Sequence, residues 1–337
     1  MMSRNSVLVF VEQNSKKIAD VSLELICKAS HLAEQLNVDV EAVALGHDMK
    51  NELQVLGYYG CDNVYYIDDK RLAHFTSVPY AKTIVNVIKK CQPQIVLFGA
   101  TTIGRDVAPR VASQLKCGLT ADCTDLKIGN YEFAGKTWEN ILLQIRPAFG
   151  GNIVATIVSP ESVPSMATVR EGVMKMTAPD ESRKINIIEE TCELSNGDFL
   201  TEILEVVREE KRVNLKATKI IIAAGMGVAT QESMVLVKQL AKVLGAEIGC
   251  SRPVVDAGLL EHDRQIGQTG TTVRPNLYIA CGISGQIQHL VGMSEANRII
   301  AINSDPNASI FRVAHYGIVG DLNNVIPKII KAYKTKV

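Results

Sequence analysis

The segment from residue 274 to 305 constrains the fold more than any other part of the sequence. An apolar run typical of a strand, Leu277–Cys281, leads into a turn at residues 282–285 and then into a segment with helical character. A second apolar run, residues 299–302, ends at Asn303. Glycines let the backbone approach a ligand closely, and a helix N-terminus offers unpaired N–H groups to an anion. This order of elements is typical of α/β proteins that hold nucleotide phosphates.

The composition narrows the class of protein further. The chain has 337 residues, which suits two domains of ordinary size. Acidic and basic residues balance at 36 each, so nothing indicates a nucleic-acid or membrane-surface protein. No apolar run is long enough to span a bilayer, and residues 7–11 already have the pattern of a first strand, without a targeting segment before it. We therefore expect a cytoplasmic protein without membrane insertion.

The eight cysteines are scattered and form no Cys-x-x-Cys pair. A zinc or iron–sulfur site therefore has no ligand set in this sequence, and we expect reduced thiols, most of them buried.

The first half of the chain alternates strand and helix patterns. Four strands are predicted at residues 7–11, 40–45, 63–67 and 94–98, and three helices at residues 21–36, 52–58 and 80–90. This order favours a mostly parallel sheet with helices on both faces. After Cys117 the pattern changes, and three further strands at residues 126–128, 140–145 and 153–157 predict an antiparallel extension.

Residues 178–213 lose apolar periodicity and gain charge, which predicts a domain join that could include a strand. The α/β pattern restarts at residues 219–223, and a last helix should begin after Asp321, a good N-cap residue. The fold class is therefore α/β with two domains: an N-terminal α/β domain over residues 1–205 with a mostly parallel sheet, and a C-terminal doubly wound, Rossmann-like domain over residues 206–337.

Several polar and glycine-rich motifs occur in the second half, and each of them taken alone can be explained by local structure without a ligand. Gly225 and Gly227 follow a strand, but Thr230 replaces the third glycine of a dinucleotide fingerprint, so a structural turn explains them equally well. A surface ion pair would explain Arg252, and a polar turn would explain residues 265–270.

Taken together and in order, the motifs resemble the α subunit of electron transfer flavoprotein. The motifs that carry the resemblance in the second half are Gly225-x-Gly227 and residues 251–256, 265–270, 282–289, 303–305 and 316–321. Those in the first half are residues 104–112, 118–123 and 146–151. The resemblance therefore covers nearly the whole chain.

The resemblance implies FAD in the C-terminal domain and a heterodimer with an electron transfer flavoprotein β subunit, which the N-terminal domain would contact. It also implies a redox partner of the acyl-CoA dehydrogenase or reductase type. The chain would carry electrons without substrate chemistry of its own, as a subunit of an oxidoreductase system.

The resemblance also implies which residues hold the cofactor. Ser251 and Arg252 would approach the isoalloxazine ring, where Arg252 would favour negative charge on the flavin. His289 would lie near the pyrimidine carbonyl as a donor. The loop that lines the ring, with the Thr269 hydroxyl near N5, would consist of Gln265, Ile266, Gly267, Gln268 and Thr269. The ribityl and pyrophosphate groups would be held by Ser284, Gly285, Gln286, Ile287 and Gln288. The adenosine end would be held by Asn303, Asp321 and Leu322.

Three departures from the family pattern indicate a divergent branch. Met226 stands where the family usually has an arginine that reaches FAD, which predicts weaker or altered contacts there. Gln286 stands where a small residue is common, and His315 where an acidic residue is common.

Other functions stay open. In an NADH-dependent electron-bifurcating complex, the β subunit would hold a second FAD in place of AMP, and an accessory role in an acyl-CoA reductase complex also fits. A stand-alone NAD-dependent oxidoreductase would use Gly225-x-Gly227 with Glu247 as the ribose ligand. A nucleotide-binding regulatory subunit without redox activity is a further class.

Overall fold

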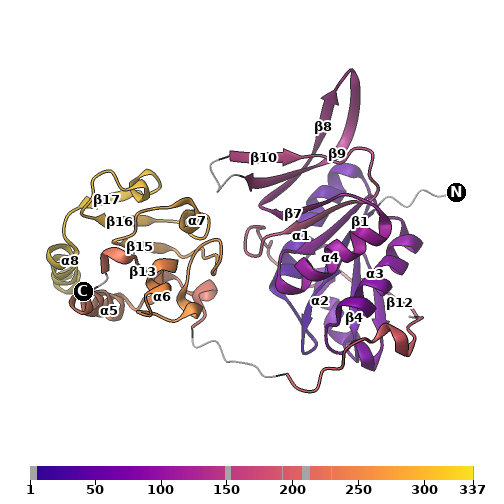
Figure 1. The fold of residues 1–337 in the computed structure, drawn as a ribbon, viewed down its shortest axis with the longest axis horizontal. Helices are drawn as coiled ribbons and strands as arrows, with labels where there is room; N and C mark the ends of the chain where they lie inside the picture. Colours follow the sequence, from indigo (N-terminus) through magenta and orange to yellow (C-terminus); the bar gives the residue numbers. More distant parts are fainter. Residues whose placement is uncertain (1–5, 149–152, 192, 207–212, 229, 337) are drawn as a thin grey trace. The chain divides into compact units, whose positions relative to one another are not determined.

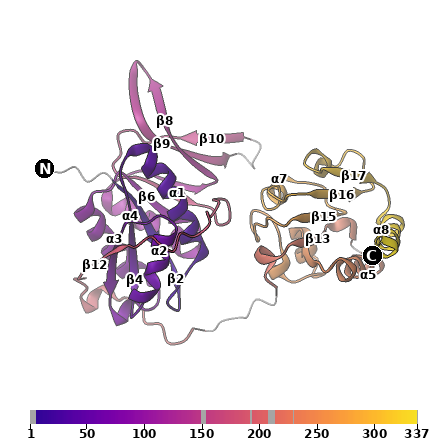
Figure 2. The same cartoon turned by 180° about the vertical axis from the view of Figure 1, so that it is seen from behind.

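The computed structural model describes residues 6–148, 153–191, 193–206, 213–228 and 230–336 (Figure 1). Contacts between residues divide the described chain into two compact units, one ending at Val206 and the other beginning at Val213. Each unit has its own parallel sheet with helices packed against it (Figures 1 and 2). The predicted two-domain α/β class is therefore confirmed.

The first unit is built on a seven-stranded sheet in which every neighbouring pair runs parallel. Its strands, in spatial order, are β12 (Asn186–Glu189), β5 (Asn63–Asp68), β4 (Asp39–Gly46), β1 (Ser6–Val11), β6 (Ile95–Gly99), β11 (Ser165–Val169) and β7 (Leu119–Cys123). All six residues of β1 are buried, as expected for the centre of a sheet covered on both faces.

Two apolar cores cover the two faces of this sheet. Val7 and Val9 of β1 point into the first core, and Leu8 and Phe10, which alternate with them, point into the second. Helices α1 (Asp20–Leu36) and α2 (Gln54–Tyr58) supply the first core, whereas α3 (Ser77–Cys91) and α4 (Thr102–Leu115) supply the second. The side chains on both faces of the sheet are therefore buried, and this burial stabilises the unit.

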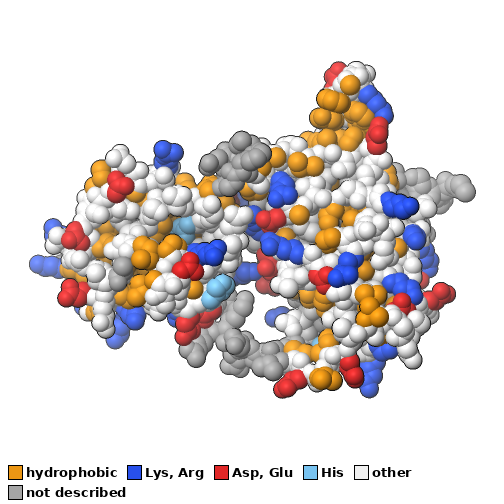
Figure 3. Space-filling model, viewed as in Figure 1, with side chains coloured by type: hydrophobic (Ala, Val, Ile, Leu, Met, Phe, Trp, Pro, Cys, Tyr) orange, Lys and Arg blue, Asp and Glu red, His pale blue; other side chains and the backbone are white. Residues whose placement is uncertain are grey.

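The predicted antiparallel extension is a three-stranded sheet of β8 (Asp125–Phe133), β9 (Lys136–Ala148) and β10 (Ile153–Ile157). The β8–β9 hairpin projects from the unit in Figure 1, and hydrophobic side chains colour its surface orange in Figure 3. Phe133 near its tip is 64% exposed.

Three strands of the first sheet were missed or only suspected from the sequence. Strands β7 and β11 were not predicted, and β11 enters the sheet between β6 and β7 after the antiparallel excursion. Strand β12 lies within the predicted join and pairs with β5 at the edge of the sheet. Much of the predicted join is therefore part of the first unit.

Short elements complete the described chain. A small hairpin pairs β2 (Gln13–Asn14) with β3 (Lys17–Ile18). The 3₁₀ turns are η1 (Lys50–Leu53), η2 (Lys70–Leu72), η4 (Asn196–Asp198), η5 (Leu215–Ala217), η6 (Met226–Val228), η7 (His262–Arg264) and η8 (Ser309–Arg312).

The second unit contains a five-stranded parallel sheet. Its spatial order is β14 (Glu247–Cys250), β13 (Ile220–Ala224), β15 (Leu277–Cys281), β16 (Ile299–Asn303) and β17 (Tyr316–Val319). One face is covered by α5 (Gln231–Leu244), α6 (Arg252–Asp256) and α8 (Leu322–Lys336). The other face is covered by α7 (Ile287–Leu290), η8 and connecting loops.

The order of these strands places a topological switch point between β13 and β15. From β13 the chain moves to β14 on one side, and then crosses to β15 on the other side. Open α/β sheets bind ligands outside the carboxyl ends of the two strands where the winding direction reverses, and the order 2-1-3-4-5 is one of the two common doubly wound orders. The strand order therefore predicts a ligand site at the loops after β13 and β15.

Two further expectations can be compared with the described residues. None of the helices described here has both the length and the apolar character needed to cross a membrane. None of the seven described cysteines forms a disulfide, and six of them are buried. Burial raises the pKa of Cys281 to about 12, so this thiol stays protonated and unreactive.

Candidate functional site

Two glycine-rich loops meet at the switch point. Gly225 at the end of β13 donates its N–H to the Cys281 carbonyl at 2.8 Å, and Gly227 donates to the Gly282 carbonyl at 3.0 Å. A Cβ atom on Gly225 would lie 2.2 Å from the Gly282 oxygen. Glycine is therefore required here by the contact between the two loops, and this requirement exists without any ligand.

The turn after β15 presents polar side chains to solvent. Gly282 and Gly285 both have positive φ, at 63° and 86°, and a Cβ on Gly285 would lie 2.1 Å from the Ile310 nitrogen. The Ile310 N–H donates to the Ser284 carbonyl at 3.0 Å, which anchors the turn on η8. Gly285 is buried by this contact, whereas Ser284 and Gln286 on either side of it are exposed. The turn therefore has the form predicted for a phosphate-holding loop.

The helix after this turn is a single turn long. Helix α7 covers Ile287–Leu290, and Gln286 occupies its N-cap position without a side-chain capping bond. So short a helix has little macrodipole, and its contribution to anion binding would come from individual N–H groups. Gln288 is exposed, and its carbonyl accepts a hydrogen bond from the Gln268 N–H at 2.6 Å.

The predicted ring-lining loop separates into exposed and supporting residues. Gln268 and Thr269 are exposed. Gln265 is 3% exposed and donates through Nε2 to the Thr269 hydroxyl at 2.9 Å. Ile266 is buried and donates its N–H to the Cys250 carbonyl at 2.8 Å, beside the end of β14. The accessible side chains are therefore those of Gln268 and Thr269, and the buried neighbours hold them.

The Ser251–Arg252 pair lies at the carboxyl end of β14. Ser251 is 7% exposed and stands at the N-cap of α6 without a capping hydrogen bond. The Arg252 side chain is 64% exposed, and its ion pair with Asp256 is long, at 3.5 Å. Exposed pairs of this kind contribute little, so the guanidinium can leave Asp256 for a ligand at small cost. Arg252 is therefore a permanently charged donor at the edge of the site.

His289 is buried, and its ring is hydrogen-bonded inside the domain. Nε2 lies 2.9 Å from the Tyr278 hydroxyl, and Nδ1 lies 3.0 Å from the Ile266 carbonyl oxygen. Burial lowers the pKa of His289 to about 4, although the hydrogen bond to Ile266 opposes this shift. The imidazole is therefore neutral near pH 7, and donation to a flavin carbonyl would require one of these two bonds to be exchanged.

The residues predicted for the adenosine end follow β16 and β17. Asn303 donates through Nδ2 to the Ile283 carbonyl at 2.9 Å and accepts from the Asp305 N–H at 3.0 Å. Asp321 is exposed and caps α8 by accepting from the Asn323 N–H at 2.9 Å, as expected for an N-cap residue. Leu322 is buried. Asn303 therefore joins two loops of the site, and Asp321 remains accessible from solvent.

Ser251, Arg252, Asn303 and Asp321 lie at or directly after the carboxyl ends of strands in the second unit, whereas residues 265–269 lie between η7 and β15, and residues 284–289 form the turn and helix after β15. Sequence reasoning missed Tyr278, which is 0% exposed and contacts His289 from within β15. A single aromatic residue in an apolar strand is typical of a core position, so the sequence held no signal for this contact.

Glu247 does not occupy the position needed for a ribose ligand. It is the first residue of β14, at the amino end of the sheet, and it pairs with Arg264 at 3.3 Å. A dinucleotide site of the Rossmann type needs this acid near the carboxyl ends of the strands. This geometry contradicts the stand-alone NAD-dependent alternative.

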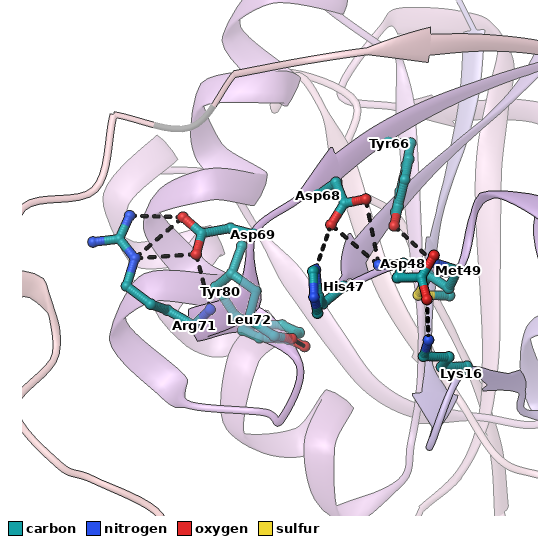
Figure 4. A network of polar contacts seen from close by, with 10 residues as sticks. All are labelled: Lys16, His47, Asp48, Met49, Tyr66, Asp68, Asp69, Arg71, Leu72 and Tyr80. Atoms are coloured by element: carbon teal, nitrogen blue, oxygen red, sulfur yellow. Dashed lines mark hydrogen bonds and ion pairs between the residues drawn. The ribbon is translucent and has the colours of Figure 1, made fainter.

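The carboxyl edge of the first sheet also carries charged residues, and these pair with one another (Figure 4). His47 Nδ1 lies 2.9 Å from Asp68, and Lys16 lies 2.5 Å from Asp48. Asp68 also accepts from the Asp48 N–H at 3.1 Å. Burial opposes ionisation of Asp68, but its hydrogen bonds outweigh this and lower its pKa. These contacts stabilise the loops after β4 and β5.

Comparison with known proteins decides the family. The model of the electron transfer flavoprotein domain matches residues 7–194, and that of the electron transfer flavoprotein FAD-binding domain matches residues 214–294. The chain belongs to the electron transfer flavoprotein family. Its similarity to an electron transfer flavoprotein subunit alpha from Thermoanaerobacterium thermosaccharolyticum is 46% identity over 99% of both chains.

Other relatives carry different names. The chain is 42% identical to Protein FixB of Azotobacter vinelandii, over 98% of this chain and 91% of the relative. It is 38% identical to the acryloyl-CoA reductase electron transfer subunit beta of Anaerotignum propionicum, over 98% of this chain and 96% of the relative. The match to the FAD-binding domain therefore assigns FAD as the cofactor of this chain.

The residues at the switch point fit FAD. The exposed side chains of Arg252, Gln268 and Thr269 can donate to a planar ring with several acceptors. Ser284 and Gln286 flank a turn of positive φ whose backbone faces the same edge. When bound, FAD supplies electron transfer, while the protein supplies binding, orientation and electrostatics.

Proposed function

We propose that this chain carries the redox-active FAD of a heterodimer with an electron transfer flavoprotein β subunit in the cytoplasm. Its redox partner would be a flavoenzyme of the acyl-CoA dehydrogenase or reductase type. The relative from Anaerotignum propionicum, which is named as an electron transfer subunit of acryloyl-CoA reductase, supports this class of partner.

One observation carries the proposed site. Arg252, Ser284 and Gln286 are exposed and follow the carboxyl ends of β14 and β15 in one parallel sheet, and the Gln268 N–H donates to the Gln288 carbonyl at 2.6 Å, so loops far apart in the sequence meet near the switch point. In this arrangement Arg252, Gln268 and Thr269 would contact the ring, and Ser284, Gln286 and Gln288 would contact the phosphates. Buried Ser251, Gln265 and Ile266, with Gly267 and Gly285, would hold these groups in place.

Arg252 has a distinct electrostatic role in this proposal. A guanidinium stays charged at every physiological pH, so it stabilises added negative charge on a nearby ring in all conditions. A charge about 4 Å away contributes on the order of 1–4 kcal/mol, depending on the local dielectric. Arg252 should therefore raise the reduction potential of the bound flavin.

The test compares Arg252→Ala with Arg298→Ala in the purified heterodimer. Arg298 is also exposed in the second unit, but it precedes β16 and so lies at the opposite edge of the sheet. We expect Arg252→Ala to lower the flavin potential and Arg298→Ala to leave it unchanged. Equal potentials in the two variants would show that Arg252 does not face the flavin.

The same preparation tests the bifurcating alternative. Extraction and quantification of the flavin should give one FAD per heterodimer for the simple carrier. Two FAD per heterodimer, with reduction by NADH, would support the bifurcating complex. Activity with purified acyl-CoA dehydrogenases then tests the proposed partner class.

A further inference from the structure

Tyr278 connects the core of the second sheet to the proposed flavin site. It lies in the middle strand β15, it is 0% exposed, and its hydroxyl lies 2.9 Å from His289 Nε2. The other ring nitrogen of His289 lies 3.0 Å from the Ile266 carbonyl oxygen. A buried chain of hydrogen bonds therefore runs from Tyr278 through His289 to the backbone beside Gln268 and Thr269.

The chemistry of these groups sets the direction of the hydrogen bonds. A carbonyl oxygen only accepts, so Nδ1 of His289 must carry the proton that it donates to Ile266. A neutral imidazole then has a lone pair at Nε2, which accepts from the Tyr278 hydroxyl. Burial keeps the imidazole neutral because it lowers the pKa of His289 to about 4. Both nitrogens of the ring and the hydroxyl are thereby satisfied inside the domain.

The loop of residues 265–269, where this series of hydrogen bonds ends, packs with its backbone directly against the backbone of α7 and Gly292. A Cβ on Gly267 would lie 2.8 Å from the Gln288 carbonyl oxygen, and a Cβ on Gly292 would lie 2.5 Å from the Gly267 nitrogen. The Gln268 N–H also donates to the Gln288 carbonyl at 2.6 Å. With such close packing, a small displacement of Ile266 must move Gln268 as well.

We infer that Tyr278 is a positioning residue of the flavin site: through His289 it holds the Ile266 carbonyl, and so sets where Gln268 and Thr269 stand at the edge of the sheet. This inference rests on the proposed placement of FAD beside residues 265–269. It assigns His289 a supporting role in one defined tautomer, with its nitrogens directed to Tyr278 and Ile266.

The first test examines the wild-type heterodimer by nitrogen NMR with ¹⁵N-labelled histidine. We expect His289 to show a protonated Nδ1 and an unprotonated, hydrogen-bonded Nε2 at neutral pH. The opposite tautomer or a charged ring would overturn the inference. This measurement needs no mutation.

The second test compares Tyr278→Phe with Tyr316→Phe, a tyrosine that is 64% exposed in β17 of the same sheet. Tyr278→Phe leaves the buried Nε2 without a donor. We expect its His289 nitrogen shifts and the circular dichroism of its bound flavin to change, and its FAD dissociation constant to rise about tenfold. Tyr316→Phe should match wild type in all three measurements.

The outcomes separate the inference from the proposed site. Unchanged flavin dichroism and FAD affinity in a folded Tyr278→Phe variant would overturn the positioning role. Changed histidine shifts with unchanged flavin properties would keep the hydrogen-bond chain but place FAD elsewhere, which would also refute the inference. If Tyr278→Phe does not fold, the wild-type tautomer decides.

Discussion

Replacing Gly225 by alanine should separate the two loops that form the proposed site. The added Cβ would lie 2.2 Å from the Gly282 oxygen, 2.6 Å from the Gly282 carbonyl carbon and 2.7 Å from the Ile283 Cα. All three atoms belong to the backbone, so no side-chain rotation can relieve the contacts. Its φ lies outside the left-handed region, so alanine meets the steric conflict without conformational strain.

The size of the effect follows from the geometry. The loops after β13 and β15 must move apart by roughly 1 Å, and overpacking of this kind typically costs about 1–3 kcal/mol. Because the same two loops flank the switch point, a comparable loss in FAD binding would weaken affinity by roughly tenfold to a hundredfold. Denaturant unfolding and FAD titration of the heterodimer measure the two quantities separately.

Gly245→Ala is the matched control for this experiment. Gly245 follows α5 with a φ of 62°, and nothing lies within 4 Å of a Cβ built on it. It therefore suffers conformational strain without steric conflict, at a cost of about 1–2 kcal/mol. FAD affinity should not change, because Gly245 precedes the amino end of β14, whereas Ser251 and Arg252 follow the carboxyl end of this strand. If Gly225→Ala binds FAD as tightly as Gly245→Ala does, the loops after β13 and β15 do not form the site.

Four further changes test other parts of the account. Burial raises the pKa of Glu12 to about 7; the hydrogen bond from Thr101 opposes this shift, and the charge of Glu171 adds to it. The folded first unit therefore binds more protons than the unfolded chain, and its stability should fall by about 3 kcal/mol as pH rises from 4.5 to 7. In urea unfolding, Glu12→Gln should flatten this dependence of stability on pH. His289 acts in the opposite sense, because burial lowers its pKa from the ordinary 6.5 to about 4. The contribution of His289 to the stability of the second unit should therefore be complete above pH 6.5 and decrease toward pH 4. An opposite pH dependence in hydrogen exchange of β15 would contradict its burial as a neutral ring. Gln144→Leu should leave stability unchanged or raise it by about 1–3 kcal/mol, because both polar atoms of the buried Gln144 amide lack a hydrogen-bond partner among the described residues. A clear loss of stability in denaturant unfolding would reveal a partner. Met226→Arg should strengthen FAD binding, because Met226 is 45% exposed beside Gly225 and its position can therefore accommodate a charged side chain. Weaker binding in a fluorescence titration would place FAD away from this loop.

The sequence was most informative where apolar periodicity was regular. The central strands of both sheets and the long helices α1, α3, α5 and α8 were predictable, because their burial leaves a period that can be recognised in the residues. Strands β7, β11 and β12 are short and lie toward the edges of the first sheet, and the chain reaches β11 after an antiparallel excursion. Tertiary pairing, rather than local pattern, defines such strands.

The candidate site was predictable in its position and less so in its internal contacts. Polar residues at strand ends indicated the carboxyl edge, which the strand order then explains. The reason for the glycines could not be predicted, because Gly225 and Gly282 meet only when β13 and β15 become neighbours. The bonds of His289 to Tyr278 and Ile266 likewise depend on three segments brought together by the fold.

The most direct test of the account is a reductive titration of the purified heterodimer, with the visible spectrum and the flavin content recorded together. We expect a yellow protein whose FAD is reduced reversibly and whose potential falls in Arg252→Ala. A colourless heterodimer that takes up no FAD, or a flavin whose potential is unaffected by Arg252, would contradict the proposed site at the switch point between β13 and β15.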